Sequence, residues 1–137
     1  MSGLEILSAR EAAVFACLAD TVAMPASPLP PVAATDAVAG FDAWLAAAPG
    51  PQRVAQRAAL LGLGLARMRQ RTPARRGALL AGLGRSRVPG VVVLFEALRA
   101  AAAACYYGDP AVMRALGYDA AERVSRGRAL RSAEGRS

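Results

Sequence analysis

The stretch VVVLFEALRAAAAACYYGDPAVMRALG, residues 91–117, decides the fold that we predict for this chain. Its large apolar residues recur every three or four positions, which places them on one face of a helix. This face consists of Val91, Leu94, Phe95, Leu98, Ala102 and Cys105. Glu96 and Arg99 lie on another face and can pair across one helical turn. The pattern predicts a long helix that buries one side against other helices.

The end of the same stretch predicts a break and a second, short helix. Asp109 and Pro110 have the pattern of a capping residue followed by a proline in the first helical turn. Gly117 is a typical helix stop, because glycine readily adopts the left-handed conformation found there. We therefore expect a turn at Gly108 and a short helix that runs through Leu116.

Residues N-terminal to this stretch supply the helices that it would pack against. Ser8 and Glu11 have the spacing of a capping box, and Pro25 stops the helix near Met24. The apolar face of this helix is formed by Val14, Phe15, Leu18 and Val22. Residues 25–34 contain four prolines, which indicates a stiff, extended connector in preference to a proline-rich docking ligand.

Two more helices are expected after the connector. One begins with Thr35 or Asp36 as its cap and ends at the PGP of residues 49–51, and the next begins within those three residues. The first is predicted to bury Val38, Phe41, Trp44 and Leu45, and the second to bury Val54, Ala58, Leu61, Leu65 and Met68. Gly62 and Gly64 are unfavourable in a helix interior, so we expect a neighbouring helix to approach closely there.

A further short helix begins at Thr72 and Pro73, and the basic turn of residues 84–90 joins it to the long helix. Its apolar residues are Leu79, Leu80 and Leu83. The chain is therefore predicted to be all-α, with a compact bundle of about five to six helices spanning residues 1–118. In residues 119–137 the large apolar side chains are Val124 and Leu130, so we expect a flexible, Arg-rich tail there.

The composition limits the kinds of function that the chain can have. Its 137 residues are enough for one domain, and they include no His. The chain therefore cannot supply an imidazole base, a His-containing triad or a His-ligated metal site. Cys17 and Cys105 form no CxxC pair, and each is expected to be a small buried thiol. No pair of carboxylates has a catalytic spacing, so we expect no enzyme activity from this chain alone.

The net charge of +7 comes from Arg, since the chain contains no Lys. The arginines are spread from Arg10 to Arg136, whereas nucleic-acid-binding proteins usually gather them on one face. The best candidate for such a face is RTPARRG, residues 71–77, together with the helix before it. A small Arg-rich regulator that binds nucleic acid is therefore the alternative function.

Neither export nor membrane insertion is expected. The N-terminal MSGLEILSAR has no basic segment before a long apolar run, and no twin-arginine pair precedes an apolar stretch. The most apolar run, residues 91–107, is interrupted by Glu96 and Arg99 and is short for a bilayer. We expect a cytoplasmic protein.

The YYGDPAVMRALGY block, residues 106–118, stands out because it contains all three tyrosines of the chain. A double bend here would gather aromatic side chains on the surface, where tyrosine is typical of protein interfaces. The alternative is that Tyr106 and Tyr118 only pack over helix ends.

This block lies within RVPGVVVLFEALRAAAAACYYGDPAVMRALGYD, residues 87–119, which follows ADTVAMPASPLPP at residues 19–31. In this order the two segments resemble the small-subunit family typified by gluconate 2-dehydrogenase subunit 3. They are also similar to the helical N-terminal region of long-chain alcohol oxidases. The 106–118 block is the most specific part of the resemblance, and Asp20, Thr21 and Pro25 add to it.

The resemblance implies a helical accessory subunit without a cofactor of its own. Its partner would be an FAD-dependent oxidoreductase of the glucose–methanol–choline class, encoded on another chain, which removes hydride from an alcohol or sugar hydroxyl. Without a twin-arginine signal, a cytoplasmic complex is favoured over a role in export. The expected partner contacts are Tyr106, Tyr107, Asp109, Pro110, Met113, Leu116 and Tyr118, with Asp109 as a helix cap. Binding only the native state of the partner would stabilise it.

Overall fold

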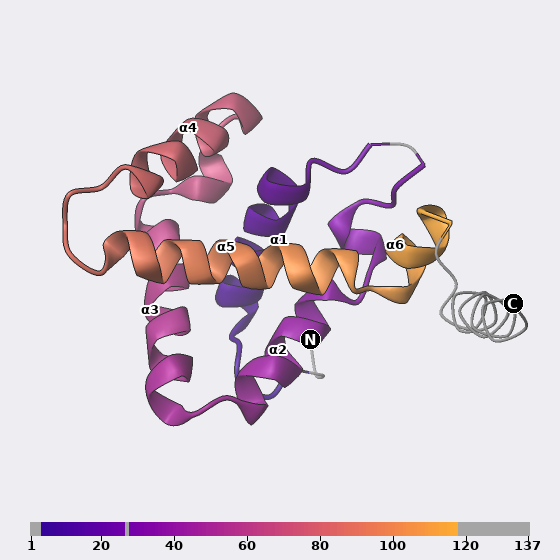
Figure 1. The fold of residues 1–137 in the computed structure, drawn as a ribbon, viewed down its shortest axis with the longest axis horizontal. Helices are drawn as coiled ribbons and strands as arrows, with labels where there is room; N and C mark the ends of the chain where they lie inside the picture. The colour runs from indigo at the N-terminus through magenta and orange to yellow at the C-terminus, as the bar shows by residue number, and fades with distance from the viewer. Residues whose placement is uncertain (1–3, 27, 118–137) are drawn as a thin grey trace, which may run out of the picture.

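The computed structural model describes residues 4–26 and 28–117, and these residues form an all-α fold (Figure 1). Six α-helices and two short 3-10 helices make up this part of the chain, which confirms the predicted fold class. The elements are α1 (Ala9–Ala23), η1 (Val32–Ala34), α2 (Ala37–Ala47), α3 (Gly50–Leu65), η2 (Met68–Gln70), α4 (Pro73–Gly84), α5 (Val91–Tyr107) and α6 (Pro110–Ala115). The predicted tail and its boundary at residue 119 lie outside the described residues.

The predicted helix ends are confirmed where capping chemistry marks them. The capping box of α1 is complete, because Ser8 Oγ accepts from the amide of Glu11 and the Glu11 carboxylate accepts from the amide of Ser8. Thr72 caps α4 with a single bond, its side-chain oxygen accepting from the amide of Arg75. Gly117 has a φ of 79°, the left-handed conformation expected after α6.

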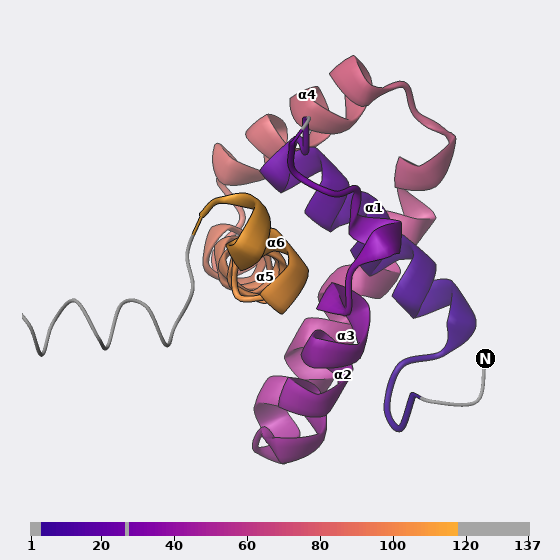
Figure 2. The ribbon, with the colours of Figure 1, turned by 90° about the vertical axis from the view of Figure 1, so that its right-hand side faces the viewer.

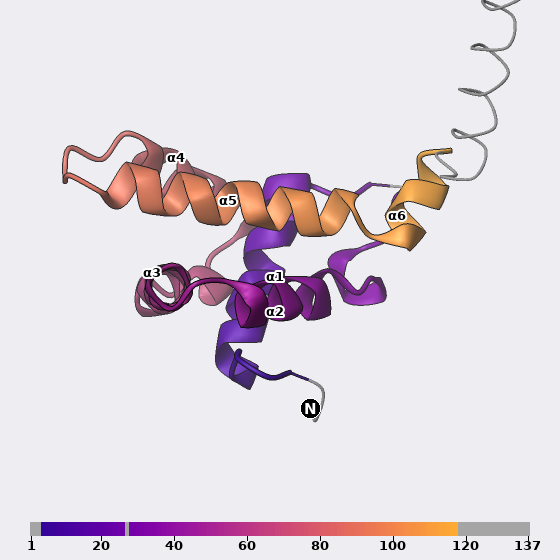
Figure 3. The ribbon, with the colours of Figure 1, turned by 60° about the horizontal axis from the view of Figure 1, so that its bottom comes forward.

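Helix α5 is the centre of the arrangement. It packs against α1, α2, α3 and α4 along its length and meets α6 at its C-terminal end. Figure 2 looks nearly along α5 and shows α4 above it and α2 and α3 below it. Figure 3 shows α5 running along one side of the molecule, so that its inner face meets the other helices and its outer face does not.

The core lies between α5 and the helices beneath it. Phe15 of α1 and Phe41 of α2 stack with their ring centroids 4.1 Å apart, and both are fully buried. The largest other buried side chains are Leu18, Leu45, Leu60, Leu63, Met68, Leu98 and Tyr106. They come from all of the long helices except α4, which contributes only half-buried leucines.

Of the five residues predicted to be buried by α3, Met68 is fully buried but lies in η2, and the prediction is wrong for the other four. Val54, Leu61 and Leu65 are 68%, 58% and 76% exposed, and Ala58 is exposed as well. The buried residues of α3 are instead Gln56, Ala59, Leu60 and Leu63. Helix α3 is apolar on both sides, so periodicity alone selects neither side.

The two glycines of α3 show which sides of the helix face its neighbours. A Cβ at Gly62 would lie 3.6 Å from the ring of Phe95 in α5, and one at Gly64 would lie 3.7 Å from Val14 in α1. Both distances are ordinary van der Waals contacts, so the close approach expected at these glycines is not found. The glycines still mark the two flanks that face α5 and α1, and the face between these flanks points outward.

Trp44 was also predicted to point inward and does not. Its side chain is 41% exposed at the edge of α2, with the ring stacked against Phe41 at a centroid distance of 5.7 Å. Phe41 and Leu45 fill the interior positions of α2, and Val38 is half-buried. The indole therefore covers the outer edge of the aromatic stack.

Asp42 has a structural role that the sequence did not suggest. Its buried carboxylate accepts hydrogen bonds from the amides of Glu5, Ile6 and Leu7 at 2.7–2.9 Å. These bonds hold the segment before α1 against α2. Burial acts to raise the pKa of Asp42, but the three amide donors outweigh burial and lower it.

Within the described residues, no helix combines the length and the apolar character needed to cross a bilayer.

Candidate functional site

The outer face of α5 carries a line of exposed apolar residues. Their spacing alternates between four and three residues, which places all of them on one side of the helix. They are Val93, Ala97, Ala100, Ala104 and Tyr107, and we call them the α5 outer stripe. Val93 is 74% exposed and Tyr107 is 42% exposed. Ala97, Ala100 and Ala104 also line a hollow to which α2 and α3 contribute, and Val93 and Tyr107 stand at the two ends of the stripe.

A shallow groove runs beside this stripe, between α5 and helices α2 and α3. It consists of two adjoining hollows of about 650 and 300 Å³, which share Trp44, Ala104 and Cys105 as lining residues. We call it the Trp44 groove. Its outer wall is the indole of Trp44, and its floor is made of small side chains of α5. A groove of this kind offers apolar surface to a binding partner, and its small side chains leave room for the partner.

Gln56 of α3 lines the same groove and has an unusual hydrogen-bonding state. The residue is only 3% exposed, yet its Oε1 has no hydrogen-bond partner among the described residues. Gln56 therefore packs beneath the groove with its amide oxygen shielded from solvent.

The predicted contact residues lie at the corner where α5 meets α6, but Tyr106 is not on its surface. The ring is fully buried, and its hydroxyl donates to the Pro30 carbonyl at 2.6 Å. The prediction that Tyr106 is a surface contact is therefore wrong. Tyr106 follows Leu98 and Ala102 at intervals of four residues, which places it on the buried face of α5. Burial, with nearby Tyr107, raises its pKa.

Asp109 caps α6, as predicted, and also ties α6 to the beginning of α2. Its Oδ2 accepts from the amide of Ala111 at 3.0 Å, while its Oδ1 accepts from the amide of Asp36 at 2.8 Å. The carboxylate is 5% exposed, so both oxygens are engaged inside the protein. Asp109 thus shapes the corner and offers almost no surface of its own.

The remaining predicted contacts are more accessible. Tyr107, Pro110 and Leu116 are exposed, and Met113 is half-buried. The ring of Tyr107 meets that of Tyr106 edge-on, with centroids 5.1 Å apart. Tyr107 is also the last residue of the α5 outer stripe, so the stripe runs directly into the corner. Tyr118 lies outside the described residues.

The structure brings together the two segments on which the family resemblance depends. Besides the bond between Tyr106 and Pro30, the hydroxyl of Tyr107 lies 3.5 Å from the carbonyl oxygen of Ala23, at the end of α1. Asp20, Thr21 and Pro25 line a separate hollow of about 390 Å³ with residues of α4. The bond between Tyr106 and Pro30 therefore holds the connector against α5.

The arginines of the alternative nucleic-acid site are largely used to hold helix ends. Arg76 donates to the carbonyls of Met68 and Arg69, and Arg71 donates to the carbonyl of Ala66. Their guanidinium groups lie against the backbone of η2 and the end of α3, and are not displayed together along one helix. This arrangement does not favour a recognition helix in the 71–77 segment.

The described residues contain no cluster of metal-ligating side chains, and both cysteines are free. Burial raises the pKa of the Cys17 and Cys105 thiols, which makes both weak nucleophiles at neutral pH. Comparisons of the chain with protein-family models, with curated proteins and with solved structures found no match.

Proposed function

We propose that this chain is a non-catalytic small subunit that binds and stabilises an FAD-dependent oxidoreductase of the glucose–methanol–choline class. The partner would act on an alcohol or sugar hydroxyl and would hold the flavin, and the complex would be cytoplasmic. The α5 outer stripe is the observation that carries the proposal. It ends in Tyr107, inside the segment that resembles the small-subunit family.

The physical character of this surface supports a protein partner. From Val93 to Tyr107 the stripe extends for about 21 Å at about 1.5 Å per residue. The five residues of the stripe are uncharged, and the nearest charged side chain is Glu96, which lies one turn from Val93 and from Ala100 and 3.9 Å from Arg99. Trp44 and Tyr107 stand at its borders, and aromatic residues of this kind often dominate binding energy at interfaces.

The residues of the corner divide into supports and contacts under this proposal. Tyr106 and Asp109 make internal hydrogen bonds and fix the backbone. Tyr107, Pro110, Met113 and Leu116 remain as contacts.

The test is purification of the tagged chain from its native host, with flavin absorbance of the eluate as the readout. We expect a yellow protein of several times the mass of this chain to co-purify. Ala100→Arg places a charge in the middle of the α5 outer stripe and should remove the flavoprotein from the eluate. Ala81→Arg, at an exposed position of α4, is the matched control and should retain it.

Binding should also change the fluorescence of Trp44, which is the only tryptophan in the chain. Adding the purified flavoprotein should shift Trp44 emission to shorter wavelength as the groove loses water. If no flavoprotein co-purifies, or if Ala100→Arg and Ala81→Arg behave alike, this function is wrong. Tight, salt-sensitive binding of DNA by the purified chain would instead support the nucleic-acid alternative.

A further inference from the structure

The outer side of α3 carries a second line of apolar residues, and the sequence predicted that these residues would be buried. It consists of Val54, Ala58, Leu61 and Leu65, and we call it the α3 outer stripe. The intervals of four, three and four residues keep it on one side of the helix. Leu61 and the buried Leu63 are two residues apart, which is about 200° around the helix axis. The two apolar sides of α3 are therefore nearly opposite.

This stripe is separate from the α5 outer stripe. The two flanks of α3 face its neighbours, since Gly62 lies against Phe95 of α5 and Gly64 lies against Val14 of α1. The stripe occupies the outward face between these flanks. A helix that is apolar on both sides is normally covered on both, so the exposed side of α3 has the character of an interface.

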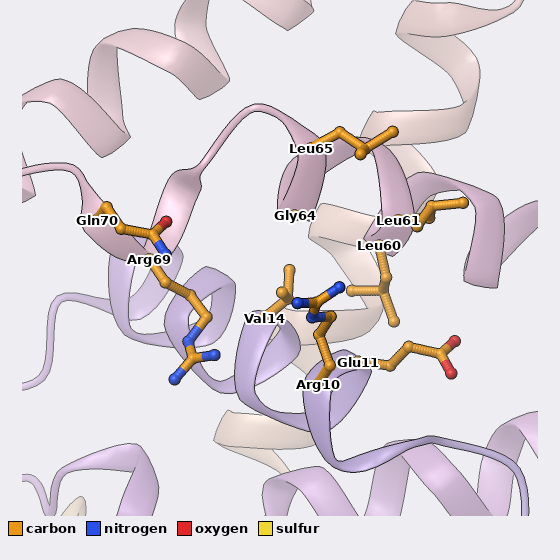
Figure 4. A pocket seen from close by; sticks show the side chains of 9 residues that line it. All are labelled: Arg10, Glu11, Val14, Leu60, Leu61, Gly64, Leu65, Arg69 and Gln70. Atoms are coloured by element: carbon orange, nitrogen blue, oxygen red, sulfur yellow. The ribbon is translucent and has the colours of Figure 1, made fainter.

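A hollow of about 180 Å³ lies where this stripe approaches α1 and η2. Val14, Leu60 and Leu61 provide apolar walls, and Arg10 and Arg69 line it as well. Figure 4 shows the guanidinium group of Arg10 between Val14 and Leu60, and the side chain of Arg69 on the other side of Val14. Apolar protein cavities of about 150 Å³ can hold a benzene ring. The hollow therefore has room for one large apolar side chain.

The charges around the hollow indicate what kind of partner would bind. Glu11 also lines it, but both of its carboxylate oxygens are engaged by Arg57, at 2.8 and 2.9 Å. In the part of the chain that the structure describes, neither Arg10 nor Arg69 has an ion-pair partner. The border of the hollow is therefore cationic, next to a strip of uncharged helix surface.

We infer that the α3 outer stripe and the hollow beside it bind an amphipathic helix of another protein that carries acidic residues next to its apolar face. One large apolar side chain of that helix fills the hollow, and its carboxylates pair with Arg10 and Arg69. A second copy of this chain is a poor occupant, because it has the same net charge of +7 and the same arginines. The stripe spans about 16 Å at about 1.5 Å per residue, which matches three turns of a bound helix.

The experiment uses two synthetic helical peptides of equal length as probes. Both carry leucines at helical spacing and one phenylalanine, and they differ only in having Glu or Lys beside the apolar face. We measure their binding to the full chain by fluorescence anisotropy. The Glu peptide should bind at least about tenfold more tightly than the Lys peptide.

Three variants locate the binding. Leu61→Gln with Leu65→Gln should remove binding of the Glu peptide, and both side chains are exposed enough to be replaced without loss of the fold. Arg10→Glu with Arg69→Glu should reverse the preference between the peptides. Arg85→Glu with Arg87→Glu makes the same change of charge at exposed positions before α5 and should leave the preference as it was.

Equal binding of the two peptides, absence of binding, or binding that survives Leu61→Gln with Leu65→Gln would overturn the inference. Self-association of the wild type that this leucine variant abolishes would also overturn it, since the occupant would then be a second copy. Circular dichroism of each variant establishes that it is folded. Because the probes contain no flavoprotein, the outcome is independent of the proposed function.

Discussion

The hydroxyl of Tyr106 donates to the backbone carbonyl of Pro30 at 2.6 Å, joining positions 76 residues apart. The bond fastens the proline-rich connector to the C-terminal end of α5. Tyr106 thus supports the fold from inside, while its neighbour Tyr107 lies on the surface. Adjacent residues of a helix point about 100° apart, so the helix period places Tyr106 inside and Tyr107 on the surface.

Replacing Tyr106 with Phe should destabilise the protein by about 1–2 kcal/mol, because the partly buried Pro30 carbonyl loses its donor. Urea unfolding at neutral pH measures the loss. Tyr107→Phe is the control, since the hydroxyl of Tyr107 is exposed and its 3.5 Å contact is weak. Equal effects of the two substitutions would show that the Tyr106 hydroxyl is not a support.

Tyr106→Phe should also change how the stability of the protein varies at high pH. Burial raises the pKa of Tyr106 in the folded state, whereas an unfolded tyrosine ionises near pH 10. The contribution of Tyr106 is therefore fully present below about pH 10 and is lost as the pH rises through the folded pKa. Wild type should lose stability more steeply above about pH 10 than Tyr106→Phe, as measured by unfolding at a series of alkaline pH values.

Gly108 should not tolerate a side chain. A Cβ at this position would lie 2.7 Å from the carbonyl oxygen of Ala104, and a backbone atom cannot move aside cheaply. We expect Gly108→Ala to lower the melting temperature. Gly40→Ala in α2 should raise it, because a Cβ there meets nothing within 4 Å and alanine is favoured in a helix by up to about 1 kcal/mol. If Gly108→Ala and Gly40→Ala changed the melting temperature in the same direction, the proposed clash with the Ala104 carbonyl would be wrong.

The sequence predicted the fold wherever a local signal was sufficient. The caps at Ser8, Thr72 and Asp109 were identified because capping depends on residues a few positions apart. The buried face of α5 was also predicted, apart from Tyr106, because its large side chains gather on one side. Nearly all of these features depend on contacts within a single turn or a single helix.

The rotation of α3 and the position of Trp44 could not be predicted in this way. Apolar residues occupy opposite sides of α3, so the choice between them depends on where α1 and α5 approach. The same limit applies to the candidate site. The four-residue intervals to Leu98 and Ala102 place Tyr106 on the buried face of α5, but its hydrogen bond to Pro30 joins positions 76 residues apart and leaves no local signal in the sequence.

The ion pair between Glu11 and Arg57 should couple α1 to α3. Two hydrogen bonds join the groups at 2.8 and 2.9 Å, and Arg57 lowers the pKa of Glu11. Because the Arg57 side chain is 46% exposed, solvent screens the pair and we expect a coupling energy of only about 0.5–1 kcal/mol. A double-mutant cycle with Glu11→Gln and Arg57→Met measures it, and the coupling should fall at high salt. A coupling that salt leaves unchanged would exclude an electrostatic origin.

Asp42 should make the free energy of unfolding decrease at acidic pH, and replacing Asp42 should remove this part of the pH dependence. At neutral pH, Asp42→Asn should cost about 3 kcal/mol, because an amide offers one acceptor oxygen where the carboxylate serves three amides. The pKa of Asp42 is lowered in the folded state, since the three amide donors outweigh burial, while an unfolded aspartate titrates near pH 4. Its contribution is therefore present above about pH 4 and is lost as the pH falls through the folded pKa. Urea unfolding between neutral pH and about pH 2 should show the gap between wild type and Asp42→Asn closing. A gap that stays constant over this range would mean that the charge on Asp42 does not hold the N-terminal segment.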